Sequence, residues 1–224
     1  MATKMAGTIT ATTDARFEPL LRAGLAKMQL EASDLQVQQL LAYLELLIKW
    51  NKAYNLTAVR DPLEMIDRHL LDSLSILPFV QAGELTDVGS GAGLPGIPLA
   101  IMKPDLQVLS LDSNGKKTRF QFQVKSSLQL ENFVVQQVRA EALQLPIKSK
   151  QLVSRAFASL KDFVKLTEPL AAEDARWLAM KGLYPEQELA ELPEEYQCQQ
   201  SHLLQVPGEE GQRHLLVLVK QAKG

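Results

Sequence analysis

Apolar residues along this chain of 224 residues recur first at helical and then at strand spacing. From Ser33, a predicted helix N-cap, leucines follow one another every three or four positions, which predicts an amphipathic helix that ends near Asn51. A second helix is predicted over residues 62–77, with Pro62 in its first turn. We therefore expect a helical extension over residues 17–80, preceded by a disordered tail over residues 1–16.

Short apolar runs alternate with helical ones after residue 80, which is typical of a parallel sheet. The five runs cover residues 85–88, 108–111, 133–138, 152–154 and 177–180. Two further runs, 196–206 and 214–219, flank P-G-E-E-G-Q too closely for a crossover helix, so we expect an antiparallel hairpin. Residues 81–224 are thus predicted to form an α/β domain with a mostly parallel, seven-stranded sheet.

The composition of the chain limits which ligands and partners this domain can bind. A single cysteine, Cys198, excludes an internal disulfide, and with only three histidines no metal site is expected. No stretch approaches eighteen consecutive apolar residues, and the first sixteen residues lack a signal-peptide core, so we expect a soluble protein that does not enter the membrane. The cysteine usage fits a reducing cytoplasm, and we expect a monomer. The net charge of -2 and pI of about 6.0 mean that any contact with nucleic acid must be local.

A glycine-rich turn follows the first predicted strand, in the segment D-V-G-S-G-A-G-L-P-G over residues 87–96. Glycines allow the backbone to turn tightly into a helix expected near Leu94, whose N-terminus would offer unpaired N–H groups to a ligand. Asp112 stands twenty-one residues after Gly91, at the end of the next strand, where a carboxylate can accept bonds from two ribose hydroxyls. The pattern predicts a nucleotide site formed by Gly89, Ser90, Gly91, Gly93, Leu94, Asp112 and Ser113.

Polar side chains beyond the other strand ends should face the same crevice, because ligands bind at the carboxyl ends of parallel strands. Ala140 and Glu141 follow the third strand, Arg155 the fourth and Lys181 the fifth. Glu141 is equally well explained as a first-turn helix acid, and Arg155 needs an anionic partner that is either a ligand carboxylate or a neighbouring acid.

Two other residues also have structural explanations. Asp112 suits a turn carboxylate that bonds its own backbone, and His69 suits a structural histidine within a helix.

Five segments together resemble one family of bacterial enzymes. They are W-N-K-A-Y-N-L-T-A-V at 50–59, R-H-L-L-D-S-L at 68–74, D-V-G-S-G-A-G-L-P-G-I-P-L at 87–99, S-R-A-F-A-S-L at 154–160 and M-K-G at 180–182. The chain resembles the RsmG (GidB) family of ribosomal RNA small-subunit methyltransferases G from about Ser33 to Lys220. One departure is Asn114, which stands where a hydrophobic residue is more usual.

The resemblance implies a class I S-adenosylmethionine-dependent methyltransferase fold that methylates ring nitrogen seven of one guanine in 16S ribosomal RNA. It places the cofactor against Gly89, Leu94, Asp112, Ala140, Glu141 and Arg155. Since the acceptor nitrogen already carries a lone pair, no general base is expected, and alignment should supply most of the catalysis. We assign no catalytic side chain.

The acceptor guanine must be reached outside a regular A-form helix, whose deep groove buries this edge of the base. From charge and predicted position we expect Arg68, Lys116 and Lys117 to contact phosphates, and Asn55, His69 and Lys181 to lie nearer the base. An NAD-dependent oxidoreductase and a non-catalytic RNA-binding ribosome-assembly factor are the alternatives.

Overall fold

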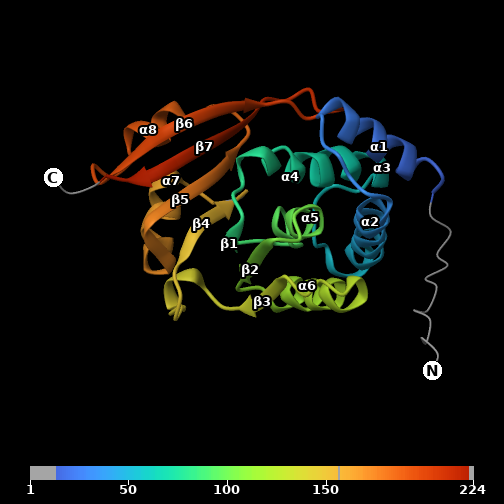
Figure 1. The fold of residues 1–224 in the computed structure, drawn as a ribbon, viewed down its shortest axis with the longest axis horizontal. Helices are drawn as coiled ribbons and strands as arrows, with labels where there is room; N and C mark the ends of the chain where they lie inside the picture. Colours follow the sequence, from blue (N-terminus) through green and yellow to red (C-terminus); the bar gives the residue numbers. More distant parts are fainter. Residues whose placement is uncertain (1–13, 156, 222–224) are drawn as a thin grey trace.

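The computed structural model describes residues 14–155 and 157–221, and begins with helices that pack against a central sheet (Figure 1). All of the predicted tail except residues 14–16 lies outside the described residues. The helices α1 (Phe17–Lys27) and α2 (Asp34–Tyr54) come first, and Ser33 caps α2 in a capping box with Gln36, as its sequence predicts. Helix α1 had no predicted counterpart, although Phe17, Leu21 and Leu25 all lie on its buried face.

The helix predicted over residues 62–77 is instead a series of short helical segments. It consists of α3 (Pro62–Met65), a π-helix η1 (Ile66–Leu71), α4 (Asp72–Leu74) and a 3-10 turn η2 (Leu77–Phe79). Pro62 stands in the first turn, and Asp61 caps it by accepting a hydrogen bond from the Leu63 N–H. A π-helix inside a helical run is uncommon and often marks a functional site.

Seven strands form one sheet in the order β3-β2-β1-β4-β5-β7-β6. They are β1 (Gly83–Val88), β2 (Leu106–Asp112), β3 (Phe133–Gln137), β4 (Ser149–Ser154), β5 (Ala171–Lys181), β6 (Tyr196–Leu204) and β7 (Arg213–Lys220). Strands β1 to β5 pair in parallel, and β7 runs antiparallel between β5 and β6, which confirms the predicted sheet and closing hairpin. Strand β5 begins six residues before the predicted run, in a polar stretch without an apolar pattern.

Helices cover both faces of this sheet, as Figure 1 shows. On one face lie α5 (Gly96–Met102) and α6 (Gly115–Leu128), with α1, α2 and α4 packed outside them. On the other lie η3 (Ala140–Ala142), α7 (Leu160–Thr167), η4 (Glu168–Leu170) and α8 (Glu186–Ala190). Successive strand residues enter opposite cores: Leu178 and Met180 belong to the first, Trp177 and Ala179 to the second.

The N-terminal helices share the first of these cores with the sheet. Leu40, Leu44 and Leu47 of α2 are buried in the same cluster as Phe120 of α6, and the Gln36 amide donates to the last carbonyls of α5 at 3.1 Å. Because α2 is packed into the same core, its side chains can reach the loops at the sheet edge. No helix in the described part of the chain has the length and apolar character needed to cross a membrane.

Candidate donor and acceptor sites at the sheet edge

The glycine-rich turn leaves β1 as a tight loop and is fastened to the next strand. Gly89, Gly91 and Gly93 all have positive φ angles, of 68°, 61° and 85°, which L side chains rarely adopt. The N–H groups of Gly89 and Ser90 both donate to the Leu111 carbonyl, at 2.9 and 3.1 Å. Helix α5 begins at Gly96, two residues later than predicted. The loop therefore sits directly over the ends of β1 and β2.

The N–H groups expected to be unpaired at this helix start are in fact bonded within the protein, one of them to a carboxylate, and a second carboxylate binds an N–H of the preceding loop. The Gly96 N–H donates to Asp87 and the Gly91 N–H to Asp112, each at 2.8 Å. This corrects the predicted ligand-binding helix N-terminus: its donors hold the loop in shape instead. Asp87 is fully buried, its Oδ1 has no hydrogen-bond partner among the described residues, and burial raises the pKa of its carboxyl to about 7.

Asp112 serves the turn as well as facing the crevice. Its Oδ1 accepts the Asn114 N–H at 2.7 Å, the self-bonding turn that its sequence also allowed. Each carboxylate oxygen offers about two acceptor positions, so both oxygens retain capacity toward ribose hydroxyls. The unusual residue in this segment, Asn114, caps α6 by accepting the Lys116 N–H, and Ser113 is exposed beside it.

Side chains from two helices support the loop from its protein side. The Tyr43 hydroxyl of α2 donates to the Ala92 carbonyl at 2.9 Å, and the buried Gln121 amide of α6 donates to the Ser90 hydroxyl and the Gly91 carbonyl, each at 2.8 Å. On its other side, a Cβ at Gly89 would meet no atom within 4 Å. The loop is thus a rigid support with open space at Gly89, and these residues fit the nucleoside part of an adenosyl ligand.

The residues after β3 lie at the same sheet edge. Ala140 is buried at the start of η3, and Glu141 is exposed, with Arg139 3.8 Å from its carboxylate. Glu141 is a first-turn acid of that short helix, as one interpretation of the sequence expected. Its exposure leaves it available to a ligand.

Arg155, which follows β4, is bound to a buried acid. Its Nη1 donates to Asp72 Oδ2 and to the Arg68 carbonyl, both at 3.1 Å. The Asp72 carboxylate is 6% exposed and also accepts Arg213 Nε at 3.2 Å through its other oxygen. The neighbouring-acid interpretation of Arg155 is therefore confirmed, and a ligand contact by the same guanidinium stays a prediction.

A pocket of about 360 Å³ unites Arg155 with three predicted substrate residues: Arg68, His69 and Lys181 line it. Val59, Asp72, Met180, Gly182, Leu204, Arg213 and His214 complete its lining. The Ser154 hydroxyl donates to the Val88 carbonyl at 2.9 Å and so fixes the β4 end beside the glycine loop.

Three other predicted substrate residues are not part of this lining. Asn55 ends α2 and accepts a hydrogen bond from Arg60 Nη2, while Lys116 is exposed on α6. Lys117 lies near the loop, since a Cβ at Gly91 would be 3.9 Å from its Nζ.

His69 in this pocket is a neutral imidazole with both nitrogens engaged. Its Nδ1 donates to the Arg68 carbonyl at 2.9 Å, so Nε2 is the acceptor for the Thr57 hydroxyl at 2.8 Å. Burial, and then the charge of Arg155, lower the pKa of His69 to about 4. His69 is therefore a structural histidine in its bonding, as one interpretation expected, although it lines the pocket.

Lys181 forms an ion pair with Glu188 of α8 at 2.8 Å, and its side chain is 14% exposed. The lysine's position is therefore fixed from the far face of the sheet. No cluster of three or more metal-ligating side chains occurs among the described residues.

Several residues of the site were not predicted, among them Tyr43, Asp72, Asp87, Gln121 and Arg213. Asp72 and Asp87 carried a usable signal, since an acidic residue inside an apolar run requires a buried partner. Tyr43 and Gln121 carried none, because a tyrosine or glutamine on an amphipathic helix is compatible with many environments.

Comparison with known proteins gives a consistent assignment. The sequence model of the family described as rRNA small subunit methyltransferase G matches residues 36–216. A protein named ribosomal RNA small subunit methyltransferase G from Pseudomonas syringae pv. syringae is 54% identical over 202 residues, which cover 90% of this chain and 94% of that protein. The protein of the same name from Pseudomonas aeruginosa LESB58 is 58% identical, over 83% of this chain and 87% of its own length.

Among solved structures, the fold matches a SAM-dependent methyltransferase from Thiobacillus denitrificans in complex with S-adenosyl-L-homocysteine. The TM-score is 0.51 at 11% identity, with 67% of this chain and 90% of that chain covered, so this likeness concerns the fold alone. Family match, relatives and sheet order agree with the five segments singled out in the sequence, and the chain belongs to the rRNA small subunit methyltransferase G family.

Proposed function

We propose that this protein transfers a methyl group from S-adenosylmethionine to ring nitrogen seven of a guanine in small-subunit (16S) ribosomal RNA, in the cytoplasm. The single observation that carries the proposal is the pocket lined by Arg68, His69, Arg155 and Lys181, at the end of strand β4, whose neighbour β1 leads into the open glycine loop. A donor on the loop and an acceptor base in the pocket would meet at that edge.

The donor site draws on the residues around the loop. Gly89 would leave space for the adenosyl group, Asp112 would accept ribose hydroxyls, and Ala140 with Glu141 would lie at the adenine side. Ser90, Gly91, Gly93, Leu94 and Ser113 complete this set, with Arg155 between donor and acceptor. S-adenosylmethionine, when bound, supplies an electrophilic methyl group whose transfer leaves the carbon–sulfur electron pair on sulfur and moves no proton.

The acceptor pocket is suited to a product that becomes positively charged. His69 has no free ring nitrogen and stays neutral at physiological pH, so it adds no positive charge beside the base and does not act as a general base. The pocket cations are each paired with carboxylates: Arg155 and Arg213 with Asp72, Lys181 with Glu188, and Arg68 with Glu64 and Glu209. Rate enhancement should then come mainly from alignment, for which effective molarities supply roughly 7 to 11 kcal/mol.

The test is methyl transfer from labelled S-adenosylmethionine to unmodified 16S RNA and to small-subunit particles from a strain that lacks the enzyme. We expect incorporation at one guanine, with mass spectrometry placing the methyl group on nitrogen seven. RNA binding without incorporation would instead favour an assembly factor.

A thermal-shift measurement separates the remaining alternative. We expect S-adenosylhomocysteine to raise the melting temperature, because a ligand that binds only the folded state stabilises it. A shift with NAD and none with S-adenosylhomocysteine would favour the oxidoreductase.

A further inference from the structure

Two arginines at the rim of the acceptor pocket, Arg68 and Arg213, are bound by the acidic side chain of Glu209 from a loop. Arg213 Nη2 donates to Glu209 Oε2 at 2.5 Å, and Arg68 Nε lies 3.4 Å from Glu209 Oε1. One carboxylate therefore bridges two arginines, one from the π-helix η1 and one from the start of β7. Both arginines also line the acceptor pocket, and their side chains are 47% and 25% exposed.

We propose that these two arginines form a phosphate clamp for the RNA strand that enters the acceptor pocket, and that Glu209 occupies the clamp until RNA displaces it. Two guanidinium groups on one carboxylate have the donor geometry that also suits a phosphodiester oxygen pair. The inference rests on the proposed function, and it extends that function by naming the anion that the pocket rim binds.

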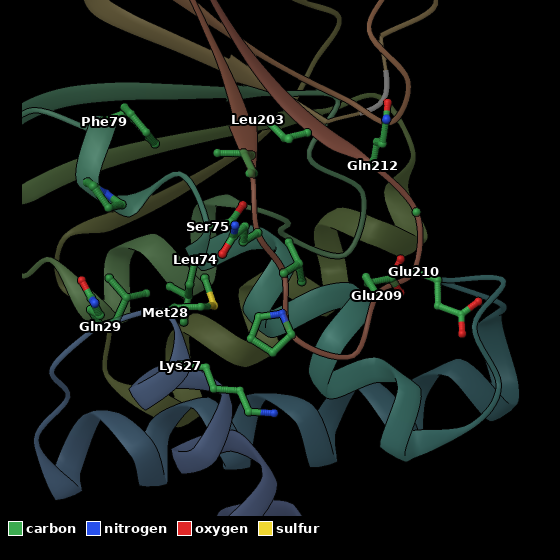
Figure 2. Close-up of a pocket in the computed structure, with 17 residues that line it drawn as sticks. Lys27, Met28, Gln29, Leu74, Ser75, Phe79, Leu203, Glu209, Glu210 and Gln212 are labelled. Atoms are coloured by element: carbon green, nitrogen blue, oxygen red, sulfur yellow. The ribbon is translucent and has the colours of Figure 1, made fainter.

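The loop that carries Glu209 has cavities beside it. It runs from β6 to β7 through P-G-E-E-G-Q, where Gly208 has a φ angle of 83° and a Cβ at that position would collide with the Asp67 carboxylate. Cavities of about 730 and 340 Å³ flank the loop, and Figure 2 shows the larger one, with Glu209 and Glu210 at one end and Phe79 and Gln29 on the opposite side. The loop therefore has space on both sides into which it can swing.

Charge also favours exchange of this carboxylate for an external anion. The Asp67 carboxylate lies against Gly208, the neighbour of Glu209, and burial together with the Glu209 charge raises the pKa of Asp67. Movement of the loop removes that repulsion, while an RNA phosphate restores the anion that Arg68 and Arg213 lose. Asp72 stays bound to Arg213 Nε throughout and keeps this arginine at the rim.

The test compares RNA binding by Glu209→Gln with binding by Glu210→Gln, using the full chain, unmodified 16S transcript and saturating S-adenosylhomocysteine. The two substitutions remove the same charge from adjacent loop positions, but only Glu209 bridges the arginines. We expect Glu209→Gln to tighten RNA binding about fivefold or more, because the arginines no longer have to release a carboxylate, and Glu210→Gln to change it by less than about twofold.

The second part of the test measures RNA binding by Arg68→Gln, both alone and combined with Glu209→Gln. The Arg68 backbone carbonyl, which holds His69 and Arg155, is retained in this variant. We expect weaker RNA binding, a salt slope smaller by about 0.7 for one lost single-strand phosphate contact, and a reduced effect of Glu209→Gln in the double variant.

Three results would overturn the clamp. They are equal tightening by both glutamate variants, no tightening by a folded Glu209→Gln protein, and an unchanged salt slope in Arg68→Gln. If Glu209→Gln does not fold, the salt slope of Arg68→Gln decides alone. Because binding is measured without methyl transfer, loss of the proposed activity with an intact clamp response would contradict only the proposed function.

Discussion

Replacement of Asp87 by asparagine should make the unfolding free energy of the protein less sensitive to rising pH. The folded protein holds the Asp87 proton up to a pKa of about 7, whereas the unfolded chain releases it near its ordinary value of 3.8. Between these values the folded state binds more protons, so this group lowers the unfolding free energy as pH rises. From pH 5 to pH 7 the unfolding free energy falls by about 1.36 kcal/mol for each of two pH units, or by about 3 kcal/mol in total.

The measurement is urea unfolding of both proteins at pH 5 and pH 8. Asparagine keeps an acceptor for the Gly96 N–H but adds a buried N–H2 group, whose cost does not depend on pH. We therefore compare differences: the unfolding free energy of Asp87→Asn minus that of the unchanged protein should rise by about 3 kcal/mol between the two pH values. His69, whose lowered pKa gives the opposite trend, is present in both proteins and cancels.

Glu84→Gln is the matched control, because Glu84 is an exposed carboxylate on the same strand. Its difference from the unchanged protein should stay constant over this pH range. A constant difference for Asp87→Asn as well would refute the reasoning, since it would mean that Asp87 ionises in the fold as readily as in water.

Three further substitutions test the loop and the ion-pair network. Tyr43→Phe leaves the buried Ala92 carbonyl unpaired, so it should cost about 1 to 3 kcal/mol of stability and weaken S-adenosylhomocysteine binding in calorimetry. Tyr54→Phe, at an exposed position on the same helix, should have neither effect. Gly89→Ala puts a methyl group into the open donor space and should weaken that binding tenfold or more, at a stability cost of about 1 kcal/mol from its positive φ angle; unchanged affinity would move the donor elsewhere. Asp72→Asn leaves two arginines without their buried carboxylate and should destabilise by about 3 kcal/mol in urea, and a loss below about 1 kcal/mol would contradict the network.

The sheet could be predicted because its strands are short apolar runs with clear turns between them. The extension of β5 over residues 171–176 could not be predicted, since A-A-E-D-A-R has no strand pattern and only its two ends, Ala171 and Arg176, pair with β4 across a register shift. The π-helix η1 was also hidden, because its residues fit an ordinary amphipathic helix equally well.

The glycine loop and Asp112 were predictable for a similar reason, since they lie close in sequence and follow a known turn chemistry. The contacts of Asp72 could not be predicted from the sequence. This carboxylate bonds Arg155 and Arg213, which follow it by 83 and 141 residues, and only the completed sheet brings the three together. Sequence spacing could place Arg155 at the crevice, but it could not distinguish a ligand from Asp72 as the partner.

The segment W-N-K-A-Y-N-L-T explains how the N-terminal helices can influence the acceptor pocket without lining most of it. Asn51, buried at the end of α2, accepts the Thr57 N–H and donates to the Val59 carbonyl, which fixes the turn after the helix. Thr57 then donates to His69, and His69 donates to the Arg68 carbonyl.

That carbonyl is the point where this chain of hydrogen bonds meets the sheet, because it also accepts Arg155 Nη1. Arg155 is consequently positioned from two sides, by Asp72 and by a relay that begins on α2. The Arg68 carbonyl of the π-helix and Asp72, which directly follows the π-helix, both bond Arg155, while the Arg68 side chain lies 3.4 Å from Glu209. A single short segment thereby contacts both Arg155 at the end of β4 and Glu209 in the loop before β7.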